Sequence, residues 1–310
     1  MPADPAAPPP LDHAAFAARY GPCALVAGGA VGMGAEYCRQ IAATGLDLLI
    51  LDRDEPALAA TAAELRAAPG AIDVATAAID LGQPADSLLD ALRRAVGDRE
   101  IGLLVANAAW SPVGPFLDVD LDALLAAIDI NCRAPVVLAH ELGARMAARR
   151  RGGMIIMSSL AAESGTAQVA LYSATKAFDL VLAEGLWYEL RDRGVDVVAI
   201  RPGSTRTPGW QSTQPPSGDL EPGADPTARS VSTGSHGRSR AGGRSHMTGV
   251  MEPADVVRDA LAALGTTPSI AAGAANRAAE AMFRSMPRRQ VIELMSGITS
   301  QLVSRDVRKP

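Results

Sequence analysis

A cluster of glycines between an apolar run and a helical pattern constrains the fold of this chain more than any other feature. The run ALVA at residues 24–27 is typical of a buried strand. Four glycines follow it: Gly28, Gly29, Gly32 and Gly34. Apolar residues at helical spacing then continue through Ile41. Strand, glycine turn and helix in this order predict the first part of a βαβ unit, because glycine permits the tight turn.

A second strand indicates what the glycine turn could bind. Residues 46–51 form another apolar run, which ends at Asp52 about twenty residues after the turn. Backbone N–H groups at a helix N-terminus can approach a pyrophosphate, and an acidic residue after the second strand can hold a ribose. The spacing GxxxGxG differs from the GxGxxG of the general dinucleotide fingerprint, so a plain structural turn remains the alternative at this point.

Strands and helices alternate along the rest of the chain, which predicts an α/β fold with a Rossmann-type, doubly wound parallel sheet. Further strands are expected over residues 103–106, 154–158, 195–201 and 269–272. Helices are expected over residues 34–44, 55–68, 86–96, 121–149, 172–193 and 253–265. Residues 274–303 predict one or two packed amphipathic helices, with an apolar wall for a bulky substrate or an oligomer face as the alternative.

A single catalytic domain is expected over residues 19–310, with a substrate loop and C-terminal helices. Residues 1–18 begin MPADPAAPPP, which lacks the basic and apolar segments of a signal peptide and predicts a disordered tail. Residues 211–248 are rich in Gly, Pro, Ser and charged residues. They predict a flexible substrate loop, with an ordinary disordered loop as the alternative.

Tyr172 and Lys176 carry the clearest sign of chemistry. They lie four residues apart in LYSATK, so a helix places them on one face. An ammonium near the Tyr172 hydroxyl favours the ionised phenol, which could then exchange a proton with a substrate oxygen near neutral pH. Ser159, in MIIMSSL upstream, could donate a hydrogen bond to the same oxygen. A packed ring and a solvated amine are the alternative interpretation of such a pair.

Together with other motifs, the glycine turn and YxxxK resemble the short-chain dehydrogenase/reductase family in its single-domain form. Residues 27–34 (AGGAVGMG) are similar to the family's TGxxxGxG, with Ala27 in place of Thr. Residues 106–109 (ANAA) are similar to its NNAG segment, and residues 202–207 to its PGxxxT turn beside the nicotinamide. The resemblance covers residues 19–210 closely and the remainder loosely.

The resemblance implies roles for individual residues. Tyr172 is the implied general acid/base, supported by Lys176, which also holds the nicotinamide ribose. Ser159 is implied to polarise the substrate oxygen, and Asn131 to position a relay water. The implied cofactor contacts are Gly28, Val31, Gly32, Met33, Gly34, Asp52, Arg53, Asp80, Leu81, Asn107, Ala108, Ala109, Tyr172, Lys176, Pro202, Gly203, Thr205 and Thr207.

Three alanines depart from the family motifs. Ala27 and Ala106 lack the polar side chains of relatives, and we expect them to face each other, which avoids an unpaired buried polar group. Ala109 places a methyl group where relatives keep glycine close to the cofactor, and we expect weaker cofactor binding.

Asp52 favours NAD as the cofactor, with NADP as the alternative. A 2′-phosphate at the end of the second strand would meet the like charge of Asp52. Val31 is apolar where many NADP-using relatives carry a basic residue. Arg53 favours NADP instead, because a guanidinium beside the ribose could pair with a phosphate.

Composition argues against several other classes of protein. The net charge of −5 and the absence of a basic stripe argue against nucleic-acid binding. No run of about 18 uncharged apolar residues predicts a membrane span. The cysteines and histidines show no metal-ligand spacing. The three cysteines read as small buried thiols, which predicts a reducing, cytoplasmic location. The cysteines are Cys23, Cys38 and Cys132.

The sequence therefore predicts an oxidoreductase that transfers a hydride between a nicotinamide cofactor and a secondary alcohol or ketone. We expect the small-molecule substrate to be bulky and apolar, and the protein to be a homodimer or homotetramer. One alternative is a catalytically silent, cofactor-sensing regulatory module of the same fold. Another is a dehydratase or epimerase of the same fold, although those usually carry a longer substrate domain.

Overall fold

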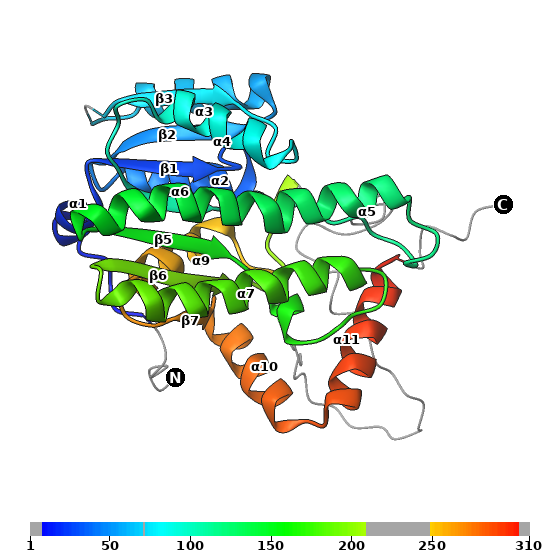
Figure 1. Cartoon of the computed structure of the whole chain (residues 1–310). Coiled ribbons are helices and arrows are strands. Elements are labelled where there is room, and N and C mark those ends of the chain that lie inside the picture. The colour runs from blue at the N-terminus through cyan, green and yellow to red at the C-terminus, as the bar shows by residue number, and fades with distance from the viewer. Residues whose placement is uncertain (1–7, 71, 209–248, 304–310) are drawn as a thin grey trace, which may run out of the picture.

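The computed structural model describes residues 8–70, 72–208 and 249–303. Within these residues, seven parallel strands form one sheet in the order β3-β2-β1-β4-β5-β6-β7 (Figure 1). The strands are β1 (Cys23–Ala27), β2 (Asp47–Asp52), β3 (Val74–Ala78), β4 (Ile101–Ala106), β5 (Gly152–Met157), β6 (Val195–Arg201) and β7 (Ser269–Ala271). This sheet confirms the expected Rossmann-type α/β fold.

Helices cover both faces of the sheet (Figure 1). One apolar cluster joins the sheet to α1 (His13–Tyr20), α2 (Gly32–Ala42), α3 (Glu55–Ala67) and α9 (Pro253–Ala263). A second cluster joins the opposite face to α4 (Ala85–Val96), α6 (Ala134–Arg149) and α7 (Ala170–Arg191). Alternate residues of β1 belong to the two clusters, as the period of two in a strand requires.

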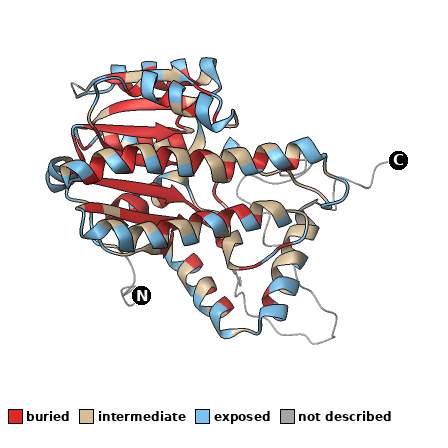
Figure 2. Cartoon of the chain, viewed as in Figure 1, coloured by how far each residue is buried: buried red, intermediate tan, exposed pale blue. Residues whose placement is uncertain are grey.

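The central strands are apolar throughout because both faces of the sheet are covered. All residues of β1, β4 and β5 are buried, and Figure 2 shows the buried strands enclosed by helices whose outer faces are exposed. The direction of the strand order changes between β1 and β4. A ligand crevice is expected outside the carboxyl ends of the strands at such a switch point.

Part of the segment expected to be a disordered tail is helical. Residues 13–18 belong to helix α1, although the sequence predicts disorder up to residue 18. Phe16 and Tyr20 are buried and pack edge to face, with ring centroids 4.7 Å apart. The Tyr20 hydroxyl and the Arg19 guanidinium both donate to Asp196. Two aromatic anchors and these polar contacts order a segment whose composition alone favours disorder.

The edge strand β3 (VATAA) was not expected from the sequence. Its residues are small and only partly apolar, and burial alternates along them, so it produces no continuous apolar run. β5 was expected to begin at Met154, but it begins at Gly152. Glycines weaken the sequence pattern of a strand, so this start was not expected. The two glycines fit here because they lie close against the side chains of Met146 and Tyr20.

The single helix expected over residues 121–149 is divided in two. A π-helical turn, η1 (Asp129–Arg133), separates α5 (Leu121–Ile128) from α6. The single residue added by a π-turn leaves the surrounding helical pattern almost unchanged, so the sequence does not reveal it. Such turns occur frequently at functional sites, and this one contains Asn131.

The C-terminal segment forms two helices, α10 (Ala274–Ser285) and α11 (Arg288–Val303), which extend away from the sheet (Figure 1). They confirm the packed helices expected there and enclose a small apolar cluster of their own. The expected substrate loop, residues 211–248, lies outside the described residues. No helix in the part of the chain that the structure describes is long and apolar enough to cross a membrane.

Candidate active site

In the glycine turn after β1, neighbouring atoms lie so close to two of the glycines that no side chain could fit at those positions. A Cβ atom on Gly34 would lie 1.8 Å from the Gly28 carbonyl oxygen. Gly28 itself has a φ of +77°, and a Cβ there would lie 2.7 Å from Ala108 Cα. The turn leads into α2, whose N-cap residue, Val31, makes no side-chain capping bond. The first N–H groups of α2 therefore remain available to an anion such as a pyrophosphate.

The residues predicted to surround the cofactor meet at this turn. Asn107, after β4, donates from Nδ2 to the Gly28 carbonyl oxygen at 2.8 Å. Ala108 lies against Gly28, and Thr207 would lie 3.2 Å from a Cβ on Gly32. The carboxyl end of β1 is thus joined to the segments after β4 and β6. Ala109 is exposed, while Met33 packs partly against the core.

Ala27 and Ala106 are register partners on β1 and β4, and both are buried. Side chains of paired residues in neighbouring parallel strands project from the same face of the sheet. The two methyl groups therefore lie side by side on one face of the sheet, which agrees with the expected pairing of the two alanines. Loss of both polar side chains leaves no unpaired group at this point in the core.

Asp52 lies at the end of β2, directly beside the glycine turn. Its Oδ2 atom accepts the Ala30 N–H at 3.0 Å, and its Oδ1 atom accepts the Asp54 N–H at 3.2 Å. Each carboxylate oxygen has a second lone pair, so ribose hydroxyls could still donate to it. Val31, which follows Ala30 in the chain, has an exposed side chain. Arg53, which follows Asp52, is exposed as well.

Asp80 and Leu81 follow β3, at the same edge of the sheet as Asp52. The Asp80 carboxylate accepts the N–H of Gly82 at 2.9 Å, which shapes the turn, and its side chain is exposed. Leu81 is buried in the core. The exposed Asp80 could reach an adenine at this edge, whereas only the backbone of Leu81 could do so.

Tyr172 and Lys176 share one face near the start of α7, as their spacing predicts. The Lys176 ammonium lies 5.8 Å from the centroid of the Tyr172 ring. It donates to the Met157 carbonyl oxygen at 2.7 Å and to Asp179 Oδ2 at 2.9 Å. Burial is the largest single effect on the pKa of Lys176 and lowers it, but the charge and hydrogen bond of Asp179, together with Tyr172 and Cys132, outweigh burial and raise that pKa overall. Lys176 is therefore a fixed ammonium rather than a solvated amine.

Ser159 lies just beyond the carboxyl end of β5. Its backbone is extended, and its Oγ atom accepts the N–H of Ala161 at 3.1 Å, which caps the short 3₁₀ helix η2 (Leu160–Glu163). The neighbouring Ser158 hydroxyl donates to the Lys176 carbonyl oxygen at 2.6 Å. This contact joins the serine segment to the helix that carries the tyrosine and the lysine.

Asn131 is fully buried in the π-helical turn, where all of its side-chain N–H groups are used. Its Nδ2 atom donates to the Trp110 carbonyl oxygen and to Thr175 Oγ1, and its Oδ1 atom accepts the Trp110 N–H. Asn131 thus joins the segment after β4 to α7 beside Tyr172. The side chain positions the site, and little of it remains to bind a relay water.

The segment after β6 begins with Pro202 and Gly203 and continues along the glycine turn. Thr205 is buried, and its hydroxyl donates to the Gly203 carbonyl oxygen at 3.1 Å. A Cβ on Gly203 would lie 2.6 Å from Asn276 Oδ1, so α10 approaches this backbone closely. Thr205 therefore shapes the turn, and Thr207 is the threonine that contacts the glycine turn.

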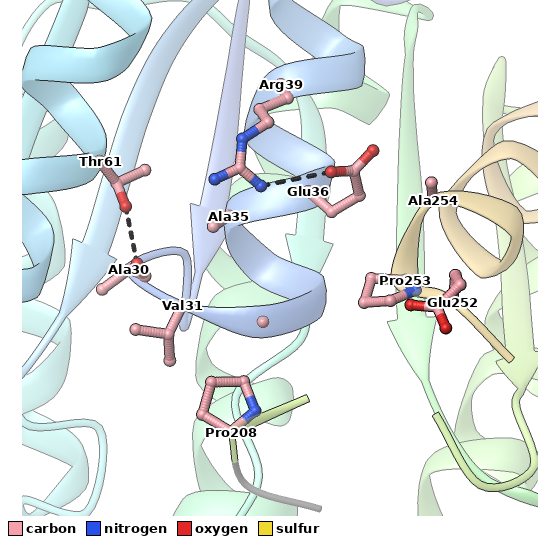
Figure 3. A pocket seen from close by; sticks show the side chains of 11 residues that line it. Ala30, Val31, Ala35, Glu36, Arg39, Thr61, Pro208, Glu252, Pro253 and Ala254 are labelled. Carbon is pink, nitrogen blue, oxygen red and sulfur yellow. Dashed lines mark hydrogen bonds and ion pairs between the residues drawn. The ribbon is translucent and has the colours of Figure 1, made fainter. Parts of the chain in front are cut away.

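An open cavity of about 440 Å³ adjoins the glycine turn (Figure 3). Val31, Glu36 and Arg39, at the N-cap and within α2, line the cavity together with Glu252, Pro253 and Ala254 on its other side, and Pro208 lies below Val31. Arg39 is already paired with Glu36 and Glu64, so it offers no free charge to a phosphate. None of the four predicted catalytic residues lines this cavity.

A buried arginine connects the catalytic segment to the C-terminal helices. Arg201, the last residue of β6, pairs through Nη1 with Glu163 of η2 and, at 2.8 Å, with Glu280 of α10. Arg288 of α11 also donates to the Glu163 carbonyl oxygen. These contacts hold α10 and α11 against the turn that follows Ser159.

The comparisons with known proteins decide the family. The family model described as short chain dehydrogenase matches residues 22–217, which is more than half of the chain. The chain belongs to the short-chain dehydrogenase family. The members of this family are oxidoreductases, and the glycine turn and the YxxxK pair of this short-chain dehydrogenase both fall inside the matched region.

Two curated relatives differ in how much of each chain they share with this short-chain dehydrogenase. The very-long-chain 3-oxoacyl-CoA reductase of Neurospora crassa is 32% identical over 182 residues, which cover 58% of this chain and 54% of that protein. The chain thus spans about half the length of the first curated relatives it matches. The 7β-hydroxysteroid dehydrogenase of Clostridium sardiniense is 26% identical over 279 residues, covering 89% of this chain and 95% of that protein.

Solved structures of similar proteins share the whole fold. A 7β-hydroxysteroid dehydrogenase structure has a TM-score of 0.76 at 25% identity, and covers 90% of this chain and 98% of its own. A short-chain dehydrogenase from Sphingobium yanoikuyae, in complex with NADPH, has a TM-score of 0.64 at 26% identity. That match covers 93% of this chain and 97% of the other.

Sequence reasoning missed two features of the site in this short-chain dehydrogenase. Asp179 lies three residues after Lys176 on the same helix, and this spacing was the available signal. Arg201 precedes the Pro-Gly turn inside an apolar run, which marks a charged residue that needs buried partners. Its partners, Glu163 and Glu280, lie far away in the sequence and could not be assigned without the fold. Among the described residues, no group of side chains is arranged to hold a metal ion.

Proposed function

We propose that this short-chain dehydrogenase transfers a hydride between a nicotinamide cofactor and a secondary alcohol or ketone. The observation that carries the proposal is the position of Tyr172, whose ring lies 5.8 Å from the buried Lys176 ammonium. A half-buried phenol beside a fixed positive charge is suited to general acid/base catalysis. The glycine turn at the switch point of the sheet provides a compatible dinucleotide site.

Each residue of the site has its own role in alcohol oxidation. The Tyr172 phenolate accepts the proton of the substrate hydroxyl, and in ketone reduction the phenol returns it. Ser159 Oγ already accepts an N–H, so its own O–H is left to donate to the substrate oxygen. Two N–H groups of Lys176 are used inside the protein, and the third is left for a ribose hydroxyl. The nicotinamide supplies the hydride chemistry when bound.

Asn131 serves this mechanism as a positioning residue. Its three side-chain hydrogen bonds fix Trp110 and Thr175, and Thr175 in turn donates to the Tyr172 carbonyl oxygen at 2.9 Å. Any relay water is therefore held chiefly by the backbone of the π-helical turn. This assignment refines the role that the family resemblance implies for Asn131.

The proposed substrate is bulky and apolar. Trp110, Phe116 and Leu117 are exposed on the segment that follows β4. Gly114 of the same segment donates its N–H to the Gln168 carbonyl oxygen at 2.8 Å, four residues before Tyr172. This contact ties the apolar segment to the residues that precede Tyr172, which supports an apolar entrance to the catalytic site. The two relatives described above, a very-long-chain 3-oxoacyl-CoA reductase and a 7β-hydroxysteroid dehydrogenase, support a substrate of this kind.

A cofactor-reduction screen tests the proposed activity. The purified protein is mixed with NAD or NADP and with secondary alcohols, including sterols, 3-hydroxyacyl thioesters and terpenoid alcohols, while a polyol serves as the polar control. The proposal requires formation of reduced cofactor with at least one apolar alcohol. Tight cofactor binding without turnover on any alcohol would favour the cofactor-sensing module instead.

We propose NAD as the preferred cofactor, although the Sphingobium yanoikuyae structure holds NADPH. A 2′-phosphate beside Asp52 would meet a like charge, and the exposed neighbour Val31 offers no cation. We expect kcat/KM to favour NAD over NADP by about tenfold or more, because a like-charge contact costs at least about 1.4 kcal/mol. Asp52→Ala should narrow this ratio.

Asp54→Ala provides the matched control for Asp52→Ala. Asp54 carries the same charge two residues away, but its side chain caps α3 by accepting the Ala57 N–H. This variant should lose some stability and keep the NAD preference. A wild-type preference for NADP would contradict the proposal and would show that Arg53, rather than Asp52, faces the ribose.

We also propose that the protein associates with itself through α5 and α7. Leu121, Leu125 and Ile128 are exposed on one side of α5, and Phe178 and Val181 are exposed on α7. Exposed apolar side chains on two helices that contact each other suit a self-complementary contact between two copies. The variant Leu125→Glu should convert the oligomer to a monomer, as measured by light scattering after size exclusion. A wild-type monomer at micromolar concentration would contradict this proposal.

A further inference from the structure

A carboxylate lies beside the catalytic lysine, where a purely apolar helix packing would be expected. The Asp179 side chain is only 1% exposed, and its Oδ2 atom lies 2.9 Å from Lys176 Nζ. Its Oδ1 atom is buried and has no hydrogen-bond partner among the described residues. A buried carboxylate with an unsatisfied oxygen is energetically costly, so its retention in the core calls for an explanation.

The contact fixes the position of the ammonium. Lys176 Nζ donates to Asp179 on its own helix and to the Met157 carbonyl oxygen at the end of β5. The Ser158 hydroxyl also holds the Lys176 carbonyl oxygen. The lysine is thus held at its backbone and at two of its three N–H groups. Only one direction remains in which it can donate to a cofactor or a water.

Few other charged or titratable groups face this pair. Tyr172 lies on the same helix, 5.8 Å from the ammonium measured to the ring centroid. Cys132 approaches from the π-helical turn, and burial raises the pKa of its thiol to about 11, so the thiol is neutral near pH 7. β5 contributes its last backbone carbonyl, and the serine that follows the strand contributes a hydroxyl. Burial raises the pKa of the Asp179 carboxyl, while the charge and hydrogen bond of Lys176 oppose this shift and favour the carboxylate. The charge that acts on Tyr172 is therefore the sum of the Lys176 ammonium and the carboxylate that it stabilises.

We propose that Asp179 is a positioning residue that fixes the Lys176 ammonium and offsets part of its charge, and thereby sets the pH at which Tyr172 ionises. The inference rests on the proposed function, since it assigns a regulator to the same acid/base. An ammonium without a counter-ion favours the phenolate strongly, whereas an ion pair favours it less. Asp179 accordingly moves the working range of Tyr172 to higher pH.

The test compares the wild type with Asp179→Asn, which keeps the size and one acceptor oxygen but removes the charge. The ionisation of Tyr172 is followed by the ultraviolet difference spectrum of the phenolate, without substrate, and is identified by its absence in Tyr172→Phe. Burial raises the pKa of Tyr20 and Tyr37 far above this range, so they do not interfere. In Asp179→Asn the midpoint should fall by about one pH unit.

Asp259→Asn is the matched control, because Asp259 is also a buried carboxylate but lies in α9, paired with Arg277. Its loss should lower the melting temperature without moving the Tyr172 midpoint. Removal of one partner from a buried ion pair destabilises a protein, so folding is checked by circular dichroism. If Asp179→Asn does not fold, Asp179→Ser, which leaves room for a water, replaces it.

Kinetics give a second readout that separates the two proposals. With an active substrate, the acid limb of kcat/KM for alcohol oxidation should move to lower pH by the same amount as the spectroscopic midpoint. An unchanged or raised midpoint in the neutral Asp179 variants would overturn the inference and leave Asp179 a structural residue. Absence of turnover in the wild type would contradict the proposed function, while the spectroscopic comparison would still decide the role of Asp179.

Discussion

Tyr172→Phe should reduce turnover by about 100-fold or more, because a positioned acid/base group contributes at least that much to proton transfer. The substitution removes only the hydroxyl and keeps the half-buried ring on α7. Lys176 keeps both of its hydrogen bonds, to Met157 and Asp179, since neither involves the tyrosine. Cofactor affinity, measured by quenching of protein fluorescence, should therefore change little.

Tyr188→Phe is the matched control for this experiment. Tyr188 lies on the same helix, but it is exposed and stacks with Arg191, whose guanidinium lies 4.2 Å from the ring centroid. Loss of its hydroxyl should leave turnover within about twofold of the wild type, as surface substitutions usually do. Near-normal turnover in Tyr172→Phe would contradict the assignment of Tyr172 as the acid/base.

The fold was largely predictable because its strong signals are local. Continuous apolar runs identify buried strands such as β1 and β4, and the glycine turn identifies the first βα connection. The missed elements lack such signals. β3 is an edge strand of small residues, and α1 is a short helix ordered by contacts between distant residues, such as Tyr20 with Asp196. The spacing of apolar residues in the sequence therefore could not reveal β3 or α1.

The site was predictable where a motif fixes the chemistry and unpredictable where tertiary contacts decide it. The spacing of Tyr172 and Lys176 places them on one helix face, and the structure agrees. The same spacing logic applies to Lys176 and Asp179, but such a pair on a helix is usually an exposed ion pair of little consequence. Only the burial of both side chains, 3% and 1% exposed, gives this pair its significance.

Arg201→Met should lower the free energy of unfolding by about 3 kcal/mol, because it leaves two largely buried carboxylates without their shared cation. Arg201 is 3% exposed and is the contact that joins β6, η2 and α10. Glu280 keeps a second partner, Arg284 at 2.5 Å, so most of the loss arises at Glu163. Denaturation by urea, with the cofactor absent, measures the change.

The same variant should reduce turnover more than cofactor affinity. Glu163 ends the 3₁₀ helix that Ser159 caps, so loss of its anchor loosens the serine rather than the glycine turn. Arg289→Met is the matched control, because Arg289 pairs with Glu293 on the exposed side of α11 and should contribute about 0.5 kcal/mol or less. If Arg201→Met is as stable as this control, the buried ion pairs do not hold the C-terminal helices in place. The double variant, Arg201→Met with Glu163→Gln, identifies the source of the loss. If it recovers the free energy of unfolding that Arg201→Met loses, the loss arises from the unpaired Glu163 carboxylate, because a neutral amide does not require a cation.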